Sequence, residues 1–172
     1  SSVSDMSRVV RCSRRTFSRC SSVLRCCERA ARETPISAAA VVVAHPGGGV
    51  KEQAAGLYAG KLAENGLIAI AFDASYQGQS TGLPRQLETP YIRTEDISAV
   101  IDHLTTLPYV DASRIGAMGI CAGGGYAANA AINDRRIKAV GTVSAVNIGQ
   151  MFPNGWENTA KDTDAVGYIE FG

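Results

Sequence analysis

The sequence has no strong excess of either charge, no long hydrophobic run and almost no cysteine outside its first 36 residues. Seventeen lysines and arginines stand against 16 aspartates and glutamates, so the net charge of +1 gives no reason to expect nucleic acid or an anionic membrane as a partner. No apolar run reaches the roughly 20 residues needed to span a bilayer. With 45% hydrophobic residues, the 172-residue chain can instead form a globular domain with a sizeable core.

The distribution of cysteine argues against a disulfide framework, because only Cys121 lies beyond the first 36 residues. The spacings of the other four do not match the paired C-x-x-C motifs of zinc sites, and no histidine lies near them, so no metal site is predicted. No motif indicates a cofactor. A reducing compartment is therefore expected, and the cytoplasm is the predicted location. The four other cysteines are Cys12, Cys20, Cys26 and Cys27.

Residues 1–36 form an arm whose composition differs from that of the rest of the chain. Before Pro35 it contains eight arginines against three acidic residues, together with many serines. Three interpretations remain open: a mitochondrial transit peptide, a disordered extension, or a segment that is not the native N-terminus, since the chain begins with Ser1 and its first methionine is Met6. We expect a globular region at 37–150 and an irregular tail at 151–172.

The globular region alternates short apolar runs with helical patterns. Buried strands are predicted at 38–44, 67–72, 115–120 and 137–146, because each is a short, nearly continuous apolar run. Helices are predicted at 51–65, at about 91–107 and from 122 to 131. This alternation indicates an α/β fold with a parallel sheet and helices on both faces.

One string in this region suggests covalent chemistry. Gly119-Ile120-Cys121-Ala122-Gly123 is G-x-C-x-G between a predicted strand and a predicted helix, the setting of a nucleophile elbow. A sharp turn there would leave no room for side chains at Gly119 and Gly123, and the positive end of the following helix would favour the reactive thiolate of Cys121. A buried structural cysteine in a small-residue turn is the simpler alternative.

A glycine-rich loop follows the first predicted strand of the globular region. In a hydrolase with this order of elements, such a loop supplies one N–H of an oxyanion hole and the residue after the nucleophile supplies the other, which here means Gly47 or Gly48 together with Ala122. A phosphate-binding loop is disfavoured, because Lys51 is not followed by serine or threonine. A plain turn remains an alternative.

Three stretches together resemble one known family. HPGGGVKEQAAGLYAGKLAENG, AFDASYQGQSTG and RIGAMGICAGGGYAANAA are similar, in order and spacing, to the dienelactone-hydrolase-like branch of the α/β-hydrolases. The resemblance covers residues 38 to 150. It implies a partial α/β-hydrolase fold, a small-molecule ester, lactone or thioester substrate, and Cys121 as the covalent nucleophile. It also implies that Asp73 and Gly78 shape the site without taking part in the chemistry.

The sequence departs from this family in its histidines. In such hydrolases the chain order is nucleophile, acid, histidine, yet no histidine follows Cys121. We expect His45 to shape the glycine loop or to hydrogen-bond locally, and His103 to be a surface or half-buried side chain. Neither Asp162 nor Asp164 is assigned as the acid. The chain is therefore expected to be truncated, and an incomplete sheet would expose an apolar edge prone to self-association.

Three functions are compatible with these observations. The first is hydrolysis by acyl transfer through Cys121, active in a longer parent chain. The second is acyl transfer from the same cysteine to an alcohol or amine. The third is a catalytically dead fragment or pseudoenzyme with a binding role. A nucleotide-binding Rossmann domain is disfavoured, because no G-x-G-x-x-G opens the first helix of the globular region.

Overall fold

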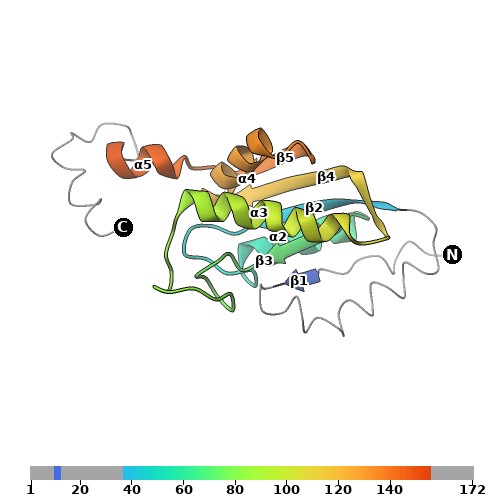
Figure 1. The fold of residues 1–172 in the computed structure, drawn as a ribbon, viewed down its shortest axis with the longest axis horizontal. Helices are drawn as coiled ribbons and strands as arrows, with labels where there is room; N and C mark the ends of the chain where they lie inside the picture. Colours follow the sequence, from blue (N-terminus) through green and yellow to red (C-terminus); the bar gives the residue numbers. More distant parts are fainter. Residues whose placement is uncertain (1–9, 13–36, 156–172) are drawn as a thin grey trace.

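The computed structural model describes residues 10–12 and 37–155, which form a parallel sheet with helices on both of its faces. The strands are β1 (Val10–Cys12), β2 (Ala38–Ala44), β3 (Ile68–Phe72), β4 (Val110–Ile120) and β5 (Ile137–Val143). The helices are α2 (Ala54–Glu64), α3 (Pro90–Thr105), α4 (Ala122–Asn133) and α5 (Ile148–Asn154). The spatial order of the strands is β1-β3-β2-β4-β5, and every neighbouring pair is parallel (Figure 1).

The central strands are continuous apolar runs because both faces of the sheet are covered. Alternate residues of β2 point to opposite sides: Val42 packs in the core with α3 and α4, whereas Val43 packs with α2. Ile97 and Ile101 of α3 belong to the first of these cores and are almost fully buried. The predicted α/β class, with helices on both faces of a parallel sheet, is therefore confirmed.

Three elements differ from the expectations for their segments. β4 begins at Val110 and not at 115, because Val110 pairs with Ala38 although the following polar residues break the apolar pattern. The helix α5 occupies 148–154, where irregular structure was expected from 151. Asn147 caps it by accepting a hydrogen bond from the N–H of Gln150, and Gly155 ends it with a φ of 74°.

The third difference lies in the arm, where residues 10–12 form β1 alongside β3, a strand that the apolar pattern did not predict. Pairing satisfies backbone groups that would otherwise be open at the edge of β3. The interpretations offered for the remainder of the arm, and for most of the tail, concern residues that lie outside the described ranges.

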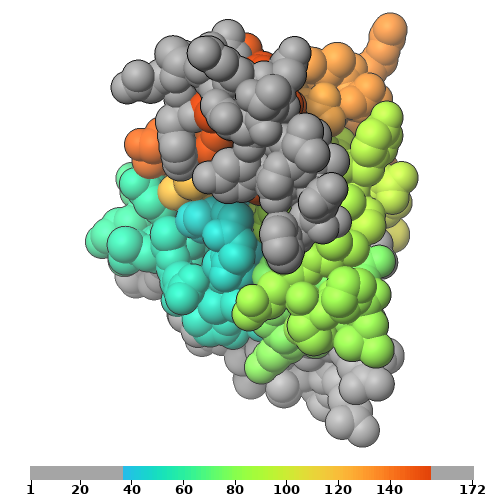
Figure 2. Space-filling model, turned by 90° about the vertical axis from the view of Figure 1, so that its left-hand side faces the viewer, coloured from blue at the N-terminus to red at the C-terminus, as the bar shows by residue number. Residues whose placement is uncertain are grey.

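The carboxyl ends of the parallel strands place several loops at one edge of the sheet. The glycine loop follows β2, a polar loop follows β3, and Cys121 follows β4 directly. Figure 2 views the molecule from this side and shows the cyan residues after β2 beside the light-green residues that lead into α3. None of the helices within the described residues is long and apolar enough to cross a membrane.

Candidate active site

Cys121 occupies the turn between β4 and α4 in a conformation that few residues adopt. Its φ is 55° and its ψ is −123°, and it is the N-cap residue of α4. A non-glycine residue at positive φ carries a conformational cost that the surroundings must offset. Here the Cys121 N–H donates to the Val143 carbonyl at 2.9 Å, and the N–H of Val146 donates to the Cys121 carbonyl at 3.1 Å. The thiol side chain is partly exposed at the start of the helix.

Two glycines make this turn sterically possible. A Cβ atom at Gly119 would lie 1.9 Å from the carbonyl oxygen of Gly123, and one at Gly123 would lie 2.5 Å from the carbonyl oxygen of Ala44. Both separations are far below van der Waals contact, so neither position accepts a side chain without movement of the backbone. The chain therefore passes sharply from strand to helix, with α4 packed directly on the end of β2.

The next two glycines serve a packing role that sequence reasoning did not identify. A Cβ at Gly125 would lie 2.2 Å from the carbonyl oxygen of Val146, and one at Gly124 would lie 2.8 Å from the Cβ of Ala145. The segment after β5 thus lies against the first turn of α4. The run Gly123-Gly124-Gly125 was the available signal, because three small residues on one helical turn indicate close approach of another backbone.

The glycine loop lies beside the first residue of α4. A Cβ built at Gly47 would lie 3.5 Å from the Cβ of Ala122, although the two residues are 75 positions apart. The loop is a turn closed by a hydrogen bond from the Gly49 N–H to the Pro46 carbonyl. The Gly48 N–H donates to Oε2 of Glu88 at 3.3 Å. Within the described residues, the Gly47 N–H has no hydrogen-bond partner.

His45 is fully buried at the end of β2, and both of its ring nitrogens are engaged. Nδ1 lies 2.7 Å from the Pro46 carbonyl, and Nε2 accepts the N–H of Ala74 at 3.2 Å. Burial, reinforced by the Arg93 guanidinium, lowers the pKa of His45 to about 4, so the ring is neutral near pH 7. The residue links the glycine loop to the loop after β3 and, as expected, bonds locally.

A buried ion pair fixes the segment between the glycine loop and α2. The Lys51 ammonium contacts Oδ2 of Asp73, and the Lys51 N–H donates to Oδ1 of the same carboxylate at 2.9 Å. Burial opposes charge on both groups, but their hydrogen bond lowers the pKa of Asp73 and raises that of Lys51. A Cβ at Gly78 would lie 2.4 Å from the Asp73 carboxyl carbon, so only a glycine allows the loop after β3 to pass this close to the carboxylate.

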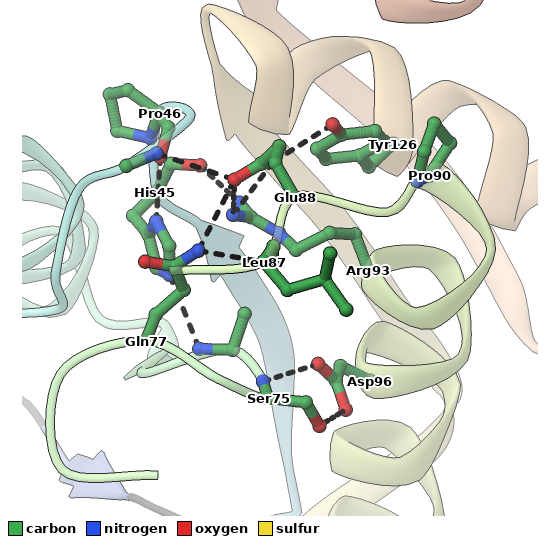
Figure 3. A network of polar contacts seen from close by, with 12 residues as sticks. His45, Pro46, Ser75, Gln77, Leu87, Glu88, Pro90, Arg93, Asp96 and Tyr126 are labelled. Carbon is green, nitrogen blue, oxygen red and sulfur yellow. Dashed lines mark hydrogen bonds and ion pairs between the residues drawn. The ribbon is translucent and has the colours of Figure 1, made fainter. Parts of the chain in front are cut away.

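The carboxylate of Glu88 lies among donors from four segments (Figure 3). Besides the Gly48 N–H, it accepts from the Tyr126 hydroxyl at 2.8 Å, from the Arg93 guanidinium at 3.1 Å and from the Gln77 amide at 3.4 Å. Arg93 is buried, donates to the His45 carbonyl at 2.6 Å and stacks 4.9 Å from the centre of the Tyr126 ring. Burial raises the pKa of Tyr126, and both the charge of Glu88 and the hydrogen bond to it act in the same direction, so the phenol stays a donor.

The structure thus brings the glycine loop, Ala122 and Cys121 to one edge of the sheet, and it places half-buried His103 on α3. Sequence reasoning did not identify Glu88, which belongs to no recognisable motif, or Tyr126, which lies in the third family-like stretch but outside the G-x-C-x-G string. A signal did exist for Arg93, which lies on the apolar stripe of α3 one turn before Ile97. A charged residue in such a stripe indicates a buried polar contact.

A parallel α/β sheet with a strained cysteine turn between strand and helix, flanked by glycines, defines an α/β-hydrolase type of domain. The family model of the dienelactone hydrolase family matches residues 29–145, more than half of the chain. The chain belongs to the dienelactone hydrolase family. This finding confirms the family resemblance of the three sequence stretches.

The chain is also similar to individual proteins over part of their length. The chain is 74% identical to the Escherichia coli K12 protein YcjY over 77% of its length and 44% of that protein. The crystal structure of PA2218 from Pseudomonas aeruginosa superposes with a TM-score of 0.75 at 41% identity, covering 78% of this chain and 42% of that one. A thiohydrolase of Aspergillus aculeatus, aneE, is 33% identical over 59% of this chain and 32% of the relative. The chain spans less than half the length of each.

Proposed function

We propose that this chain carries the nucleophile and the oxyanion hole of a hydrolase that cleaves ester, lactone or thioester bonds through a covalent intermediate on Cys121. The observation that carries the proposal is the position of Cys121, held at positive φ on the N-cap of α4 while Gly47 lies beside Ala122. Membership of the dienelactone hydrolase family supports the reaction class. The similarity to a protein named as a thiohydrolase supports thioesters among the substrates.

The proposed chemistry begins with attack of the Cys121 sulfur on the substrate carbonyl carbon. The carbonyl oxygen becomes an oxyanion that accepts hydrogen bonds from the N–H groups of Gly47 and Ala122. Collapse of this intermediate expels the alcohol or thiol, which takes up a proton, and leaves an acyl thioester on the sulfur. Water then attacks the thioester, releasing the acid and restoring the thiol.

The second half of this reaction needs a general base, and neither histidine among the residues that the structure describes is placed to serve as one. No histidine follows Cys121 in the sequence. The ring of His45 already uses both nitrogens, and His103 lies on α3 in its last turn. We therefore assign deacylation to an acid and a histidine from the part of the hydrolase fold that this sequence does not include. The isolated chain should be acylated once and not turn over.

Stoichiometric acylation tests the proposal directly. The chain is mixed with p-nitrophenyl acetate, the released p-nitrophenolate is counted, and the acetylated peptide is found by mass spectrometry. One acetyl group on Cys121 per chain is expected, together with a rapid release of one p-nitrophenolate. This rapid release should be lost in Cys121→Ala. The four arm cysteines serve as a reference inside the same molecule. Acetylation of Cys121 no faster than theirs would favour a catalytically dead protein, and catalytic turnover would show that a base is present.

A further inference from the structure

The Gly48 N–H, expected from sequence as a possible oxyanion donor, points to a carboxylate. Its hydrogen bond to Oε2 of Glu88 bridges 40 residues of sequence. Because this N–H donates to the Glu88 carboxylate, it is not available to a developing oxyanion while Glu88 holds it. The bond instead fixes the peptide that follows Gly47, and with it the direction of the neighbouring N–H groups of the loop.

The other oxygen of the same carboxylate reaches the helix that carries the cysteine. Oε1 accepts from the Tyr126 hydroxyl at 2.8 Å, and Tyr126 lies in the second turn of α4, just after Cys121 and Ala122. One side chain therefore joins the glycine loop to α4. These two segments hold the two N–H groups assigned to the oxyanion hole. Arg93 donates to both carboxylate oxygens, at 3.1 and 3.2 Å, and so restrains the rotation of the carboxylate.

We propose that Glu88 is a positioning residue that sets the separation and direction of the Gly47 and Ala122 N–H groups by linking Gly48 to Tyr126. The inference rests on the proposed function, because it concerns the oxyanion hole of that reaction. Glu88 does not touch the reacting atoms. Its contribution is to hold two donors from separate segments in place before the reaction, which is the condition for strong oxyanion stabilisation.

Glu88→Gln is the informative change. The glutamine carbonyl oxygen can still accept from Arg93 and Tyr126, so the buried guanidinium keeps an acceptor. Its NH2 group can take only one of the two oxygen positions: facing Gly48 it cannot accept the N–H, and facing Tyr126 it can only donate to the hydroxyl. The variant should fold, but its amide cannot accept from both Gly48 and Tyr126 as the carboxylate does. Tyr126→Phe breaks the link at its other end while keeping the ring over Arg93. Glu64→Gln, on the exposed surface of α2, is the matched control.

Two reactions of the same thiol distinguish positioning of the oxyanion hole from a general effect on Cys121. Acylation by p-nitrophenyl acetate passes through a tetrahedral oxyanion, whereas alkylation by iodoacetamide is a direct displacement at carbon without one. Removing an oxyanion donor costs about 100-fold to 1,000-fold, so a displaced donor should cost about tenfold. We expect Glu88→Gln and Tyr126→Phe to lower the ratio of acylation rate to alkylation rate at Cys121 about tenfold, and Glu64→Gln to leave it unchanged.

An unchanged ratio in a folded Glu88→Gln variant, or an equal fall of both rates, would overturn the inference while leaving the proposed function standing. If Glu88→Gln does not fold by circular dichroism, Tyr126→Phe decides by the same ratio. Failure of the unmodified chain to acylate at Cys121 faster than at its arm cysteines would instead overturn the proposed function, and this inference with it. Hydrogen exchange of the peptide containing Gly48 should also quicken in Glu88→Gln, and unchanged exchange would count against the link.

Discussion

At the scale of single residues, the cysteine turn depends on glycines, because a side chain at these positions would collide with the backbone. Gly119 and Gly141 are both strand glycines, but a Cβ at Gly119 would meet the Gly123 carbonyl oxygen at 1.9 Å, whereas one at Gly141 would lie 3.7 Å from the Met118 side chain. We expect Gly119→Ala to lower the free energy of unfolding by about 3 kcal/mol or to prevent folding, because backbone would have to move. Gly141→Ala should change it by less than about 1 kcal/mol. Urea unfolding compares them, and equal effects would contradict this view of the turn.

His45 makes stability depend on pH in a defined direction. Its pKa falls from 6.5 to about 4 on folding, so between these values the unfolded chain binds a proton that the folded chain does not. The free energy of unfolding should therefore fall as the pH is lowered through this window, by about 2 kcal/mol from this residue between pH 7 and pH 5. About one pH unit or more above 6.5, the ring is neutral in the unfolded chain as well, and the contribution is constant.

Urea unfolding of His45→Gln at pH 7 and pH 5 measures this contribution. The variant should be less stable than the unmodified chain at pH 7, because the hydrogen bonds to Pro46 and Ala74 are disturbed, but it should lose less stability on acidification. His103→Gln is the comparison, since burial also lowers the pKa of that half-buried ring. This variant should remove a smaller part of the pH dependence of the free energy of unfolding than His45→Gln does. The same pH dependence in His45→Gln and the unmodified chain would show that another group is responsible.

At the scale of the elements, the loops at the carboxyl edge are held by buried charges. Lys51, before α2, is only 4% exposed and pairs with Asp73, which is 2% exposed and follows β3. Lys51→Met should destabilise the chain by about 3 kcal/mol, because it leaves a buried carboxylate without its cation. Lys61→Met removes an ion pair with Glu64 on the exposed surface of α2 and should cost less than about 1 kcal/mol. Thermal unfolding of the two variants measures this difference, and similar losses would refute it.

At the scale of the whole molecule, β5 is the last strand of the sheet, and among the described strands it pairs with β4 alone. Its residues from Lys138 to Thr142 are all exposed in the described structure, and Val140 is 43% exposed. Strands of this kind pair readily with other chains, so we predict that the isolated chain self-associates. Val140→Lys should shift it toward monomer, whereas Leu57→Lys, on exposed α2, should not. Sedimentation velocity over a range of concentrations provides the measurement, and a monomeric, cooperatively unfolding sample would refute the prediction.

The sequence by itself determined the class of fold and the place of the cysteine turn. Apolar runs such as Val41-Val42-Val43 are continuous, which is typical of strands buried on both faces of a sheet. Their alternation with helical patterns indicates a parallel sheet. Local signals also located G-x-C-x-G, because a tight strand-to-helix turn imposes its steric limits on residues two positions apart. These features depend on neighbours in the chain, which a sequence displays directly.

Only the tertiary structure decided which polar groups meet. Glu88 stands in a loop without a motif, yet its carboxylate joins Gly48 to Tyr126 across separations of 40 and 38 residues. Likewise, the N–H of Gly48 was a candidate oxyanion donor in the sequence, and the structure gives it to Glu88 in another segment. The ring of His45, expected to shape the glycine loop, also bonds to Ala74 after β3. Hydrogen bonds of this kind are set by the packing of loops at the end of a sheet, and no periodicity or spacing along the chain encodes such encounters.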